Sequence, residues 1–224
     1  MKGYISQKIA SIEQEIPQNV TLIGITKQVD TAAMREAYLA GIRNFGENRL
    51  QEALAKQQEL EDLTDVSWHF IGHIQKNKVK KVLENFDWIH SVDSLALAKR
   101  MNRLARELDL VPKVFLQAKI LPDPNKYGWE AEDLWQELEQ INEYDSLNIQ
   151  GLMTILPWGL SSKEASTAFQ EVAELSAKIK SAGYSRLKMP ELSMGMSGDY
   201  KLAIQAGASQ IRLGRTIFGE RNSK

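Results

Sequence analysis

The chain alternates between two patterns of hydrophobic and polar residues from one end to the other. Short apolar runs rich in β-branched and aromatic residues predict strands, and longer stretches with apolar residues at three- and four-residue spacing predict helices. The strand-like segments are 21–26, a short one around 44–45, 68–72, 88–92, 113–120, 148–155, 191–194 and 210–214. The helix-like stretches between them are roughly 30–40, 47–61, 75–85, 94–109, 130–143, 163–182 and 198–206. Strands that alternate with helices in this way predict a parallel sheet.

The length of the repeating unit indicates how that sheet closes. Eight strand segments in 224 residues leave 28 residues per unit, which is 224 divided by eight. A strand of about 5 residues, a helix of about 11 and two loops of about 4–6 fill that length. Eight strands favour a closed (β/α)8 TIM barrel, because a doubly wound open sheet more often has about five to seven. No Gly/Ser- or Pro-rich linker divides the chain, so we expect residues 1–224 to form a single α/β domain.

The two ends of the sequence indicate how the ring of helices around this barrel is completed. Only RTIFGERNSK follows the last predicted strand, which is too little for a standard final helix. The amphipathic stretch 4–16 precedes the first strand. We therefore expect this N-terminal helix to cover the place that the final helix would occupy.

Composition excludes several classes of protein. The chain is 43% hydrophobic and contains no cysteine, so it can bury a core but has neither disulfides nor thiol chemistry. A net charge of -1 gives no overall attraction to nucleic acid or to a membrane surface. No apolar run approaches the ~20 residues that span a bilayer, and the first residues lack the apolar part of a signal peptide. We expect a cytoplasmic protein without a metal site, since His69 and His73 lie on a strand and turn rather than one helix face.

Lys27 is the first residue with candidate chemistry, because it follows the first predicted strand. Side chains alternate along a strand, so a Lys27 that points into the barrel shares that face with Ile23 and Ile25, while Leu22 and Thr26 face the helices. Poor solvation above two buried isoleucines lowers the pKa of a lysine and favours the neutral amine that forms a Schiff base. The alternative is a lysine that extends from a strand end into water.

Two glycine- and hydroxyl-rich segments near the C-terminus predict a phosphate site. In (β/α)8 enzymes the loops after strands seven and eight often bind phosphate through backbone amides and a short helix N-terminus. The residues of these loops that allow close approach or offer hydroxyls are Ser193, Gly195, Ser197, Gly198, Gly214, Arg215 and Thr216. Either segment alone could be an ordinary turn. Together with Lys27 they indicate pyridoxal 5′-phosphate (PLP), or a phosphorylated sugar in an aldolase-like reaction.

Arg212 bears on the choice between these ligands. It shares a face with Gly214, so it enters the barrel if Gly214 lines the phosphate site. An arginine beside the pyridine nitrogen of PLP keeps that nitrogen unprotonated and makes the cofactor a weak electron sink. The alternative is an arginine paired with a carboxylate across the barrel mouth.

Six segments resemble, in matching order, the motifs of the pyridoxal phosphate homeostasis protein family. They are LIGITK ending at Lys27, FGENRLQEA (45–53), WHFIGHIQKNK (68–78), HSVDS (90–94), GLMTI (151–155) and LSMGMSGDYKLAIQAGASQIRLGRTIFGER (192–221). This family has a single-domain barrel related in fold to the N-terminal domain of alanine racemase. One departure is IGHIQKNK, with His73 and Lys76, where the family more commonly shows IGPLQSNK.

The resemblance implies a set of cofactor contacts and a role. PLP is expected as a Schiff base on Lys27, with its phosphate near Ser193, Ser197, Gly214 and Thr216 and its ring near Asn48 and Arg212. Family members bind and supply PLP and influence vitamin B6 and amino-acid/keto-acid balance, without an established catalytic turnover. The resulting expectation is a carrier or regulator that holds PLP and releases it to a competing amine or to an apo PLP-enzyme.

Two enzymatic hypotheses remain beside this expectation. A PLP-dependent amino-acid racemase needs bases on both faces of the cofactor, one of which a second domain or subunit supplies in alanine racemase. The 224 residues leave no such second domain, so we expect a non-catalytic protein with no catalytic residues. The other hypothesis is a Schiff-base aldolase for a sugar phosphate. A short barrel without an evident dimerisation element suggests a monomer.

Overall fold

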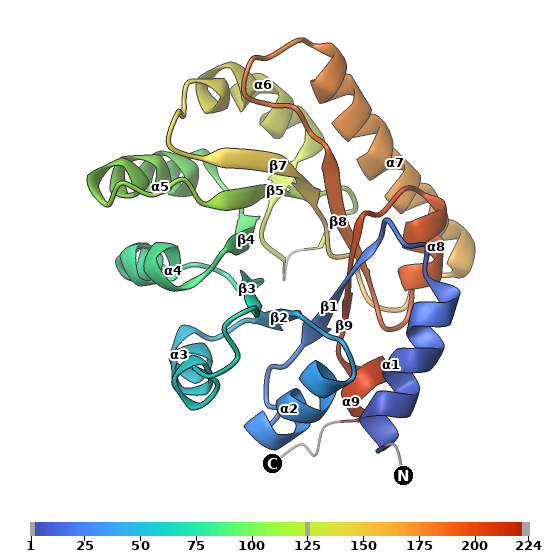
Figure 1. The fold of residues 1–224 in the computed structure, drawn as a ribbon. Helices are drawn as coiled ribbons and strands as arrows, with labels where there is room; N and C mark the ends of the chain where they lie inside the picture. The colour runs from blue at the N-terminus through green and yellow to red at the C-terminus, as the bar shows by residue number, and fades with distance from the viewer. Residues whose placement is uncertain (1–2, 124–125, 221–224) are drawn as a thin grey trace.

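A closed barrel of parallel strands forms the centre of the molecule (Figure 1). The computed structural model describes residues 3–123 and 126–220. The barrel strands are β1 (Thr21–Ile25), β2 (Asn44–Glu47), β3 (Ser67–Phe70), β4 (Trp88–Val92), β5 (Lys113–Lys119), β7 (Asn148–Met153), β8 (Glu191–Met196) and β9 (Gln210–Leu213). Each pairs in parallel with its neighbour, and β1 closes the ring against β9. The predicted (β/α)8 fold is confirmed.

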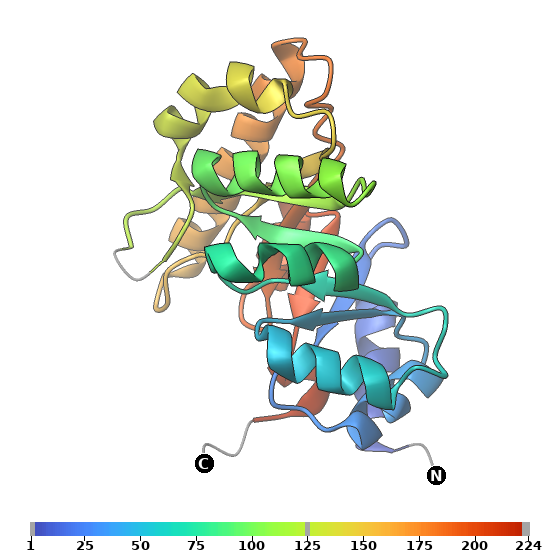
Figure 2. The same ribbon diagram turned by 90° about the vertical axis from the view of Figure 1, so that its left-hand side faces the viewer.

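A ring of helices surrounds the strands. The helices are α1 (Tyr4–Glu15), α2 (Thr31–Leu39), α3 (Leu50–Glu59), η1 (Lys76–Lys78), α4 (Val79–Asn85), α5 (Leu95–Glu107), α6 (Ala131–Asn142), α7 (Ser162–Ser181), α8 (Tyr200–Gln205) and α9 (Arg215–Phe218). Figure 2 shows α3, α4, α5 and α6 lying beside one another in chain order on the outside of the barrel. Among these described helices, none is long and apolar enough to cross a membrane.

The N-terminal helix α1 occupies the place that the sequence predicted for it. The final helix α9 has only 4 residues, and α1 packs beside it and beside α2 (Figure 1). Ile5, Ile9 and Ile12 bury one face of α1 at helical spacing. Its last residue, Glu15, accepts a hydrogen bond from Tyr200 Oη at 2.9 Å, which ties α1 to α8.

Two differences from the sequence expectation concern element boundaries. A two-residue strand, β6 (Trp129–Glu130), pairs with the last two residues of β5 just before α6. The helix expected over 47–61 begins only at Leu50, because Glu47 is the last residue of β2. The apolar spacing of α3 was real, but the strand pairing of Glu47 with Phe70 takes precedence over it.

Buried side chains form two regions on either side of the strands. Most aliphatic and aromatic residues, such as Leu22 and Phe45, pack between the strands and the helices. Ile23, Ile25 and other inward residues fill the barrel itself. The buried residues of these strands also include polar side chains, among them His69, His90, Ser193 and Arg212.

Candidate functional site

A cavity of about 560 Å³ opens at the carboxyl ends of the strands. This is the end at which (β/α)8 proteins place their functional residues. Five of the seven residues that the sequence singled out line it: Lys27, Asn48, Ser197, Arg212 and Gly214. The other two are close to this group but are not part of the cavity wall: Ser193 lies beneath Arg212, and the backbone of Thr216 binds Ser197.

Lys27 reaches the cavity from the turn that follows β1. A side chain at Gly46, on the neighbouring strand, would meet Ile25 at 2.5 Å and Ile23 at 3.2 Å, so both isoleucines point into the barrel. Thr26 is buried on the opposite side and hydrogen-bonds to Glu47. Lys27 is half-buried and lines the cavity, which is the arrangement that strand alternation predicted.

Asn48 contributes an unused hydrogen-bond acceptor to the cavity wall. Its Oδ1 is buried and has no partner among the described residues. The backbone of Asn48 lies so close to Gly72 that a Cβ at Gly72 would be 2.2 Å from the Asn48 carbonyl oxygen. Because buried polar atoms are nearly always hydrogen-bonded in folded proteins, this orphaned oxygen is suited to a ligand that carries a donor.

The loops after β8 and β9 meet beside the cavity. Ser197 Oγ accepts a hydrogen bond from the backbone N–H of Thr216 at 3.3 Å, which joins the two loops. Asp199 Oδ1 accepts the N–H of Met196 at 2.6 Å and closes the turn after β8. Burial raises the pKa of the Asp199 carboxyl above its ordinary value. Small residues, hydroxyls and backbone amides are thus concentrated where the sequence predicted a phosphate site.

Gly195 allows the first of these loops to form. Its φ is +92°, which a residue with a side chain rarely adopts. A Cβ there would lie 2.6 Å from Cβ of Ala203 and 2.9 Å from Cα of Tyr200. The glycine therefore lets β8 bend into its loop while α8 packs directly against it.

The polar interior of the barrel forms one continuous chain of hydrogen bonds that ends at Arg212. Arg212 donates to Ser193 Oγ at 2.7 Å, and Ser193 Oγ lies 2.8 Å from Nδ1 of His90. His90 Nε2 lies 2.9 Å from Nδ1 of His69, and His69 Nε2 lies 3.0 Å from Oδ1 of Asn44. No pattern in the sequence predicted this series of hydrogen bonds. Side chains alternate along a strand, so His69 shares a face with Ile71, which lines the cavity. This alternation does not show that His69 binds His90.

The guanidinium fixes the direction of every bond in the chain. Arginine can only donate, so the proton of Ser193 is directed to the remaining partner, Nδ1 of His90. His90 then carries its proton on Nε2 and donates to His69. His69 in turn donates from Nε2 to the side-chain oxygen Oδ1 of Asn44. Each imidazole is neutral and held in one tautomer.

This arrangement also decides the role of Ser193. The residue is fully buried, does not line the cavity, and its hydroxyl already has two partners. The structure therefore does not bring Ser193 into the expected phosphate site. It places Ser193 as a support for Arg212, which also donates to the carbonyl oxygen of Thr154 at 2.7 Å.

Burial lowers the pKa values of Arg212, His69 and His90 in this series of hydrogen bonds. Desolvation lowers the pKa of Arg212 to about 10, so the guanidinium remains charged at neutral pH. Desolvation, reinforced by the charge of Lys113, lowers the pKa of His69 to about 3. The pKa of His90 falls well below its ordinary value for the same main reason, with further contributions from His69 and Arg212.

Stability is therefore expected to fall in mild acid. The unfolded chain protonates His69 near pH 6.5, whereas the folded chain does so only near pH 3, so the unfolded state binds more protons between these values. Stability contributed by the neutral imidazole is present above pH 6.5 and is lost as the pH falls toward 3. Between pH 7 and pH 5 this amounts to about 2 kcal/mol for His69 alone. Urea unfolding at both pH values measures the loss, and His69→Gln should reduce it; an equal loss in that variant would contradict the assignment.

A second histidine feature lies at the rim, where the chain departs from the common family motif. His73 Nδ1 is 2.8 Å from Oδ2 of Asp93, and its ring stacks on Tyr127 with centroids 3.7 Å apart. These contacts join the turn after β3 to Asp93, which follows β4, and to Tyr127 in the loop after β5. Within residues 3–123 and 126–220, no group of three or more His, Asp or Glu side chains is arranged to hold a metal ion.

Comparison with known families first defines the class of this barrel. The sequence model described as alanine racemase, N-terminal domain, matches residues 3–222. Alanine racemase from Clostridium difficile is 16% identical and superposes with a TM-score of 0.80 over 99% of this chain and 60% of that chain. At this identity the similarity shows the fold alone. The barrel is thus of the alanine racemase N-terminal type.

Closer relatives define the particular family. The pyridoxal phosphate homeostasis protein of Synechocystis is 50% identical over 206 residues, covering 92% of this chain and 94% of that protein. Its counterpart from Pseudomonas aeruginosa is 41% identical over 207 residues, covering 92% and 86%. PipY of Synechococcus elongatus, solved with PLP bound, is 47% identical with a TM-score of 0.92, covering 96% of this chain and 100% of that chain. This chain belongs to the pyridoxal phosphate homeostasis protein family.

Proposed function

We propose that this protein binds PLP in the cavity at the barrel mouth and serves intracellular PLP homeostasis, and with it amino-acid and keto-acid balance. One observation carries the proposal: a single cavity is lined by Lys27, by Arg212 and by both loops expected to bind phosphate. The PLP-bound structure of PipY, a family member, supports it.

The residues present fit this cofactor. Lys27 supplies a primary amine, and Ser197, Gly214 and the amides of the two joined loops supply donors for a phosphate. Asn48 Oδ1, buried and unpartnered, supplies an acceptor. Thr216 does not line the cavity, and we assign it to the phosphate site through its backbone N–H, which binds Ser197 Oγ.

Each of these residues has a definite task toward the ligand. PLP, when bound, supplies an aldehyde that condenses reversibly with a primary amine, and Lys27 is the amine that we assign to this Schiff base. Arg212 holds a positive charge at the floor of the cavity and is assigned to the pyridine nitrogen, which it keeps unprotonated. The cavity walls shield the aldehyde from other amines until an amine or an apo-enzyme takes it up.

We favour a carrier over an enzyme. The named relatives are homeostasis proteins, and a cation at the ring nitrogen gives a weak electron sink. The fold shared with alanine racemase makes an amino-acid racemase the second candidate. Release of deuterium from Cα of labelled alanine at a rate well above that of free PLP would support the racemase instead.

The proposal is tested by trapping the covalent link. Purified protein is incubated with PLP, reduced with borohydride and digested for mass spectrometry. A pyridoxyl group is expected on Lys27. No adduct at this residue, or an adduct spread evenly over surface lysines, would refute covalent binding in the cavity.

A further inference from the structure

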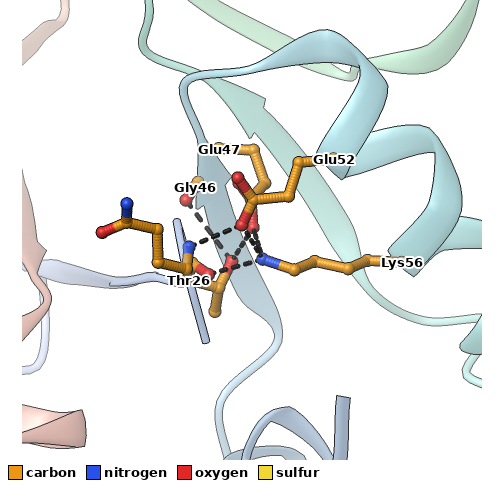
Figure 3. A network of polar contacts seen from close by, with 6 residues as sticks. Thr26, Gly46, Glu47, Glu52 and Lys56 are labelled. Atoms are coloured by element: carbon orange, nitrogen blue, oxygen red, sulfur yellow. Dashed lines mark hydrogen bonds and ion pairs between the residues drawn. The ribbon is translucent and has the colours of Figure 1, made fainter. Parts of the chain in front are cut away.

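A cluster of charged side chains lies beside Thr26, the residue before Lys27, between the end of β2 and α3 (Figure 3). We call Glu47, Glu52 and Lys56 the Lys56 cluster. Lys56 Nζ is 2.7 Å from Oε1 of Glu47 and 2.6 Å from Oε1 of Glu52. The side chain of Glu47 is 0% exposed and that of Lys56 is 8% exposed. The cluster does not line the cavity, and the proposed binding of PLP does not involve its side chains.

The cluster holds the backbone on both sides of Lys27. On the N-terminal side, Lys56 Nζ donates to the carbonyl oxygen of Thr26 at 2.6 Å. On the C-terminal side, the N–H of Gln28 donates to Oε1 of Glu52 at 2.5 Å. Gln28 has a φ of +60°, an uncommon conformation for a residue with a side chain. Lys27 thus sits in a short turn whose two flanking peptide groups are bound to the cluster.

The third member of the cluster binds the turn through a side chain. Thr26 Oγ1 donates to Oε1 of Glu47 at 2.7 Å, the same oxygen that accepts from Lys56. The carbonyl oxygen of Thr26 also accepts the N–H of Val29 at 2.9 Å and closes the turn. Lys56 and Glu52 thus bind this turn to α3, and Glu47 binds it to the end of β2.

General stability does not explain such an arrangement. Removing charges from water is costly, and well-packed apolar residues often stabilise a protein as much as a buried ion pair. The cost is visible here, because burial raises the pKa of the Glu47 carboxyl despite its contact with Lys56. In addition, Glu47 Oε2 has no hydrogen-bond partner among the described residues. A costly cluster next to a functional residue is better explained by its effect on that residue.

We propose that Glu47, Glu52 and Lys56 are positioning residues for Lys27: they hold the turn of residues 26–28 so that the lysine side chain stays directed into the cavity. This inference rests on the proposed covalent role of Lys27. Loss of the cluster lets the strained turn relax, and the amine is then in the correct place for only part of the time. Covalent capture weakens, whereas binding that does not use the amine persists.

Comparing two ligands distinguishes a positioning role of the Lys56 cluster from a general contribution to the folded structure. PLP can bond to Lys27, whereas pyridoxine 5′-phosphate has the same ring and phosphate but an alcohol in place of the aldehyde. We expect Lys56→Met and Glu52→Ala to weaken PLP binding about tenfold, or about 1.4 kcal/mol. Binding of pyridoxine 5′-phosphate should stay within about twofold of the wild-type value, or about 0.4 kcal/mol. Equilibrium dialysis measures both, and borohydride trapping at saturating PLP should decline in parallel with PLP affinity.

Matched variants control for changes in ligand binding that result only from a loss of protein stability. Glu52→Gln keeps an oxygen acceptor for Gln28 and should behave like the wild type. Asn102→Ala removes a buried hydrogen bond to the N–H of Ser146, at the opposite end of the barrel, and should lower the melting temperature without changing the ratio of the two affinities. Glu52 is partly exposed, so Glu52→Ala decides the question if Lys56→Met does not fold.

The outcomes are distinguishable. Equal weakening of both ligands in Glu52→Ala, or no change in either, would overturn the positioning role. A wild-type protein that binds both ligands equally and shows no adduct on Lys27 would refute the proposed covalent function itself, and the positioning role with it.

Discussion

Lys27→Ala is expected to abolish covalent capture of PLP while leaving a bound, non-covalent ligand. The amine is lost, but the loops after β8 and β9 and the acceptor of Asn48 remain in place. The long-wavelength absorbance of the covalent complex should disappear, and borohydride should trap no adduct. The affinity for PLP should fall about 10- to 100-fold, or about 1.4–2.8 kcal/mol, toward that for pyridoxine 5′-phosphate.

A second lysine at a strand end provides the control for this variant. Lys119 is the last residue of β5, pairs with Glu130 at 2.8 Å, and does not line the cavity. Lys119→Ala should retain the absorbance and the adduct. If Lys27→Ala still yields a stoichiometric adduct, another amine holds the cofactor and our assignment of Lys27 is wrong.

Arg212→Glu is expected to have the second large effect, on both stability and cofactor chemistry. Arg212 is 2% exposed and donates to Ser193 and to the carbonyl oxygen of Thr154, and a glutamate cannot replace both donors. The new carboxyl would also lie near Asp199, whose coulombic attraction to Arg212 would be lost. Leaving these groups unpaired should destabilise the fold by about 3–5 kcal/mol.

The same variant changes the environment that we assign to the ring nitrogen. A carboxylate can accept a hydrogen bond from a pyridinium, so the ring nitrogen should shift toward protonation. The bound cofactor should then promote faster exchange of the Cα protons of amino acids. The pH dependence of the absorbance and deuterium release report these changes. Arg212→Gln, which keeps donors but no charge, should fold better and show a smaller shift. Unchanged spectra in both variants would show that Arg212 is not beside the ring.

Much of the scaffold could be predicted because its signals are local. Strand and helix periods depend on neighbours in the chain, and eight short units in 224 residues leave few alternatives to a barrel. The inward face of β1, with Ile23 and Ile25, follows from alternation alone. The glycine- and hydroxyl-rich loops near Ser197 and Gly214 were visible because close backbone approach requires small residues.

The supports of the site were not predictable in this way. His69 and His90 are 21 positions apart, and His90 and Ser193 are 103 apart, yet each pair is joined by a hydrogen bond. No local pattern links these residues, and the expectation from the sequence was that Ser193 would contact the phosphate. The Lys56 cluster was not predicted for a different reason. The helical pattern over 47–61 placed Glu47 in a helix, whereas it is the last residue of a strand.

The sequence by itself determined the barrel, and it predicted the carboxyl ends of the strands as the functional end, with Lys27 and the two loops as ligand-binding elements. Only the tertiary structure decided how these are held: by the chain from Arg212 to Asn44 inside the barrel and by the Lys56 cluster outside it. The reason is physical. Periodicity tells which face of an element a side chain occupies, whereas the partner it meets depends on closure of the barrel, which brings distant strands together.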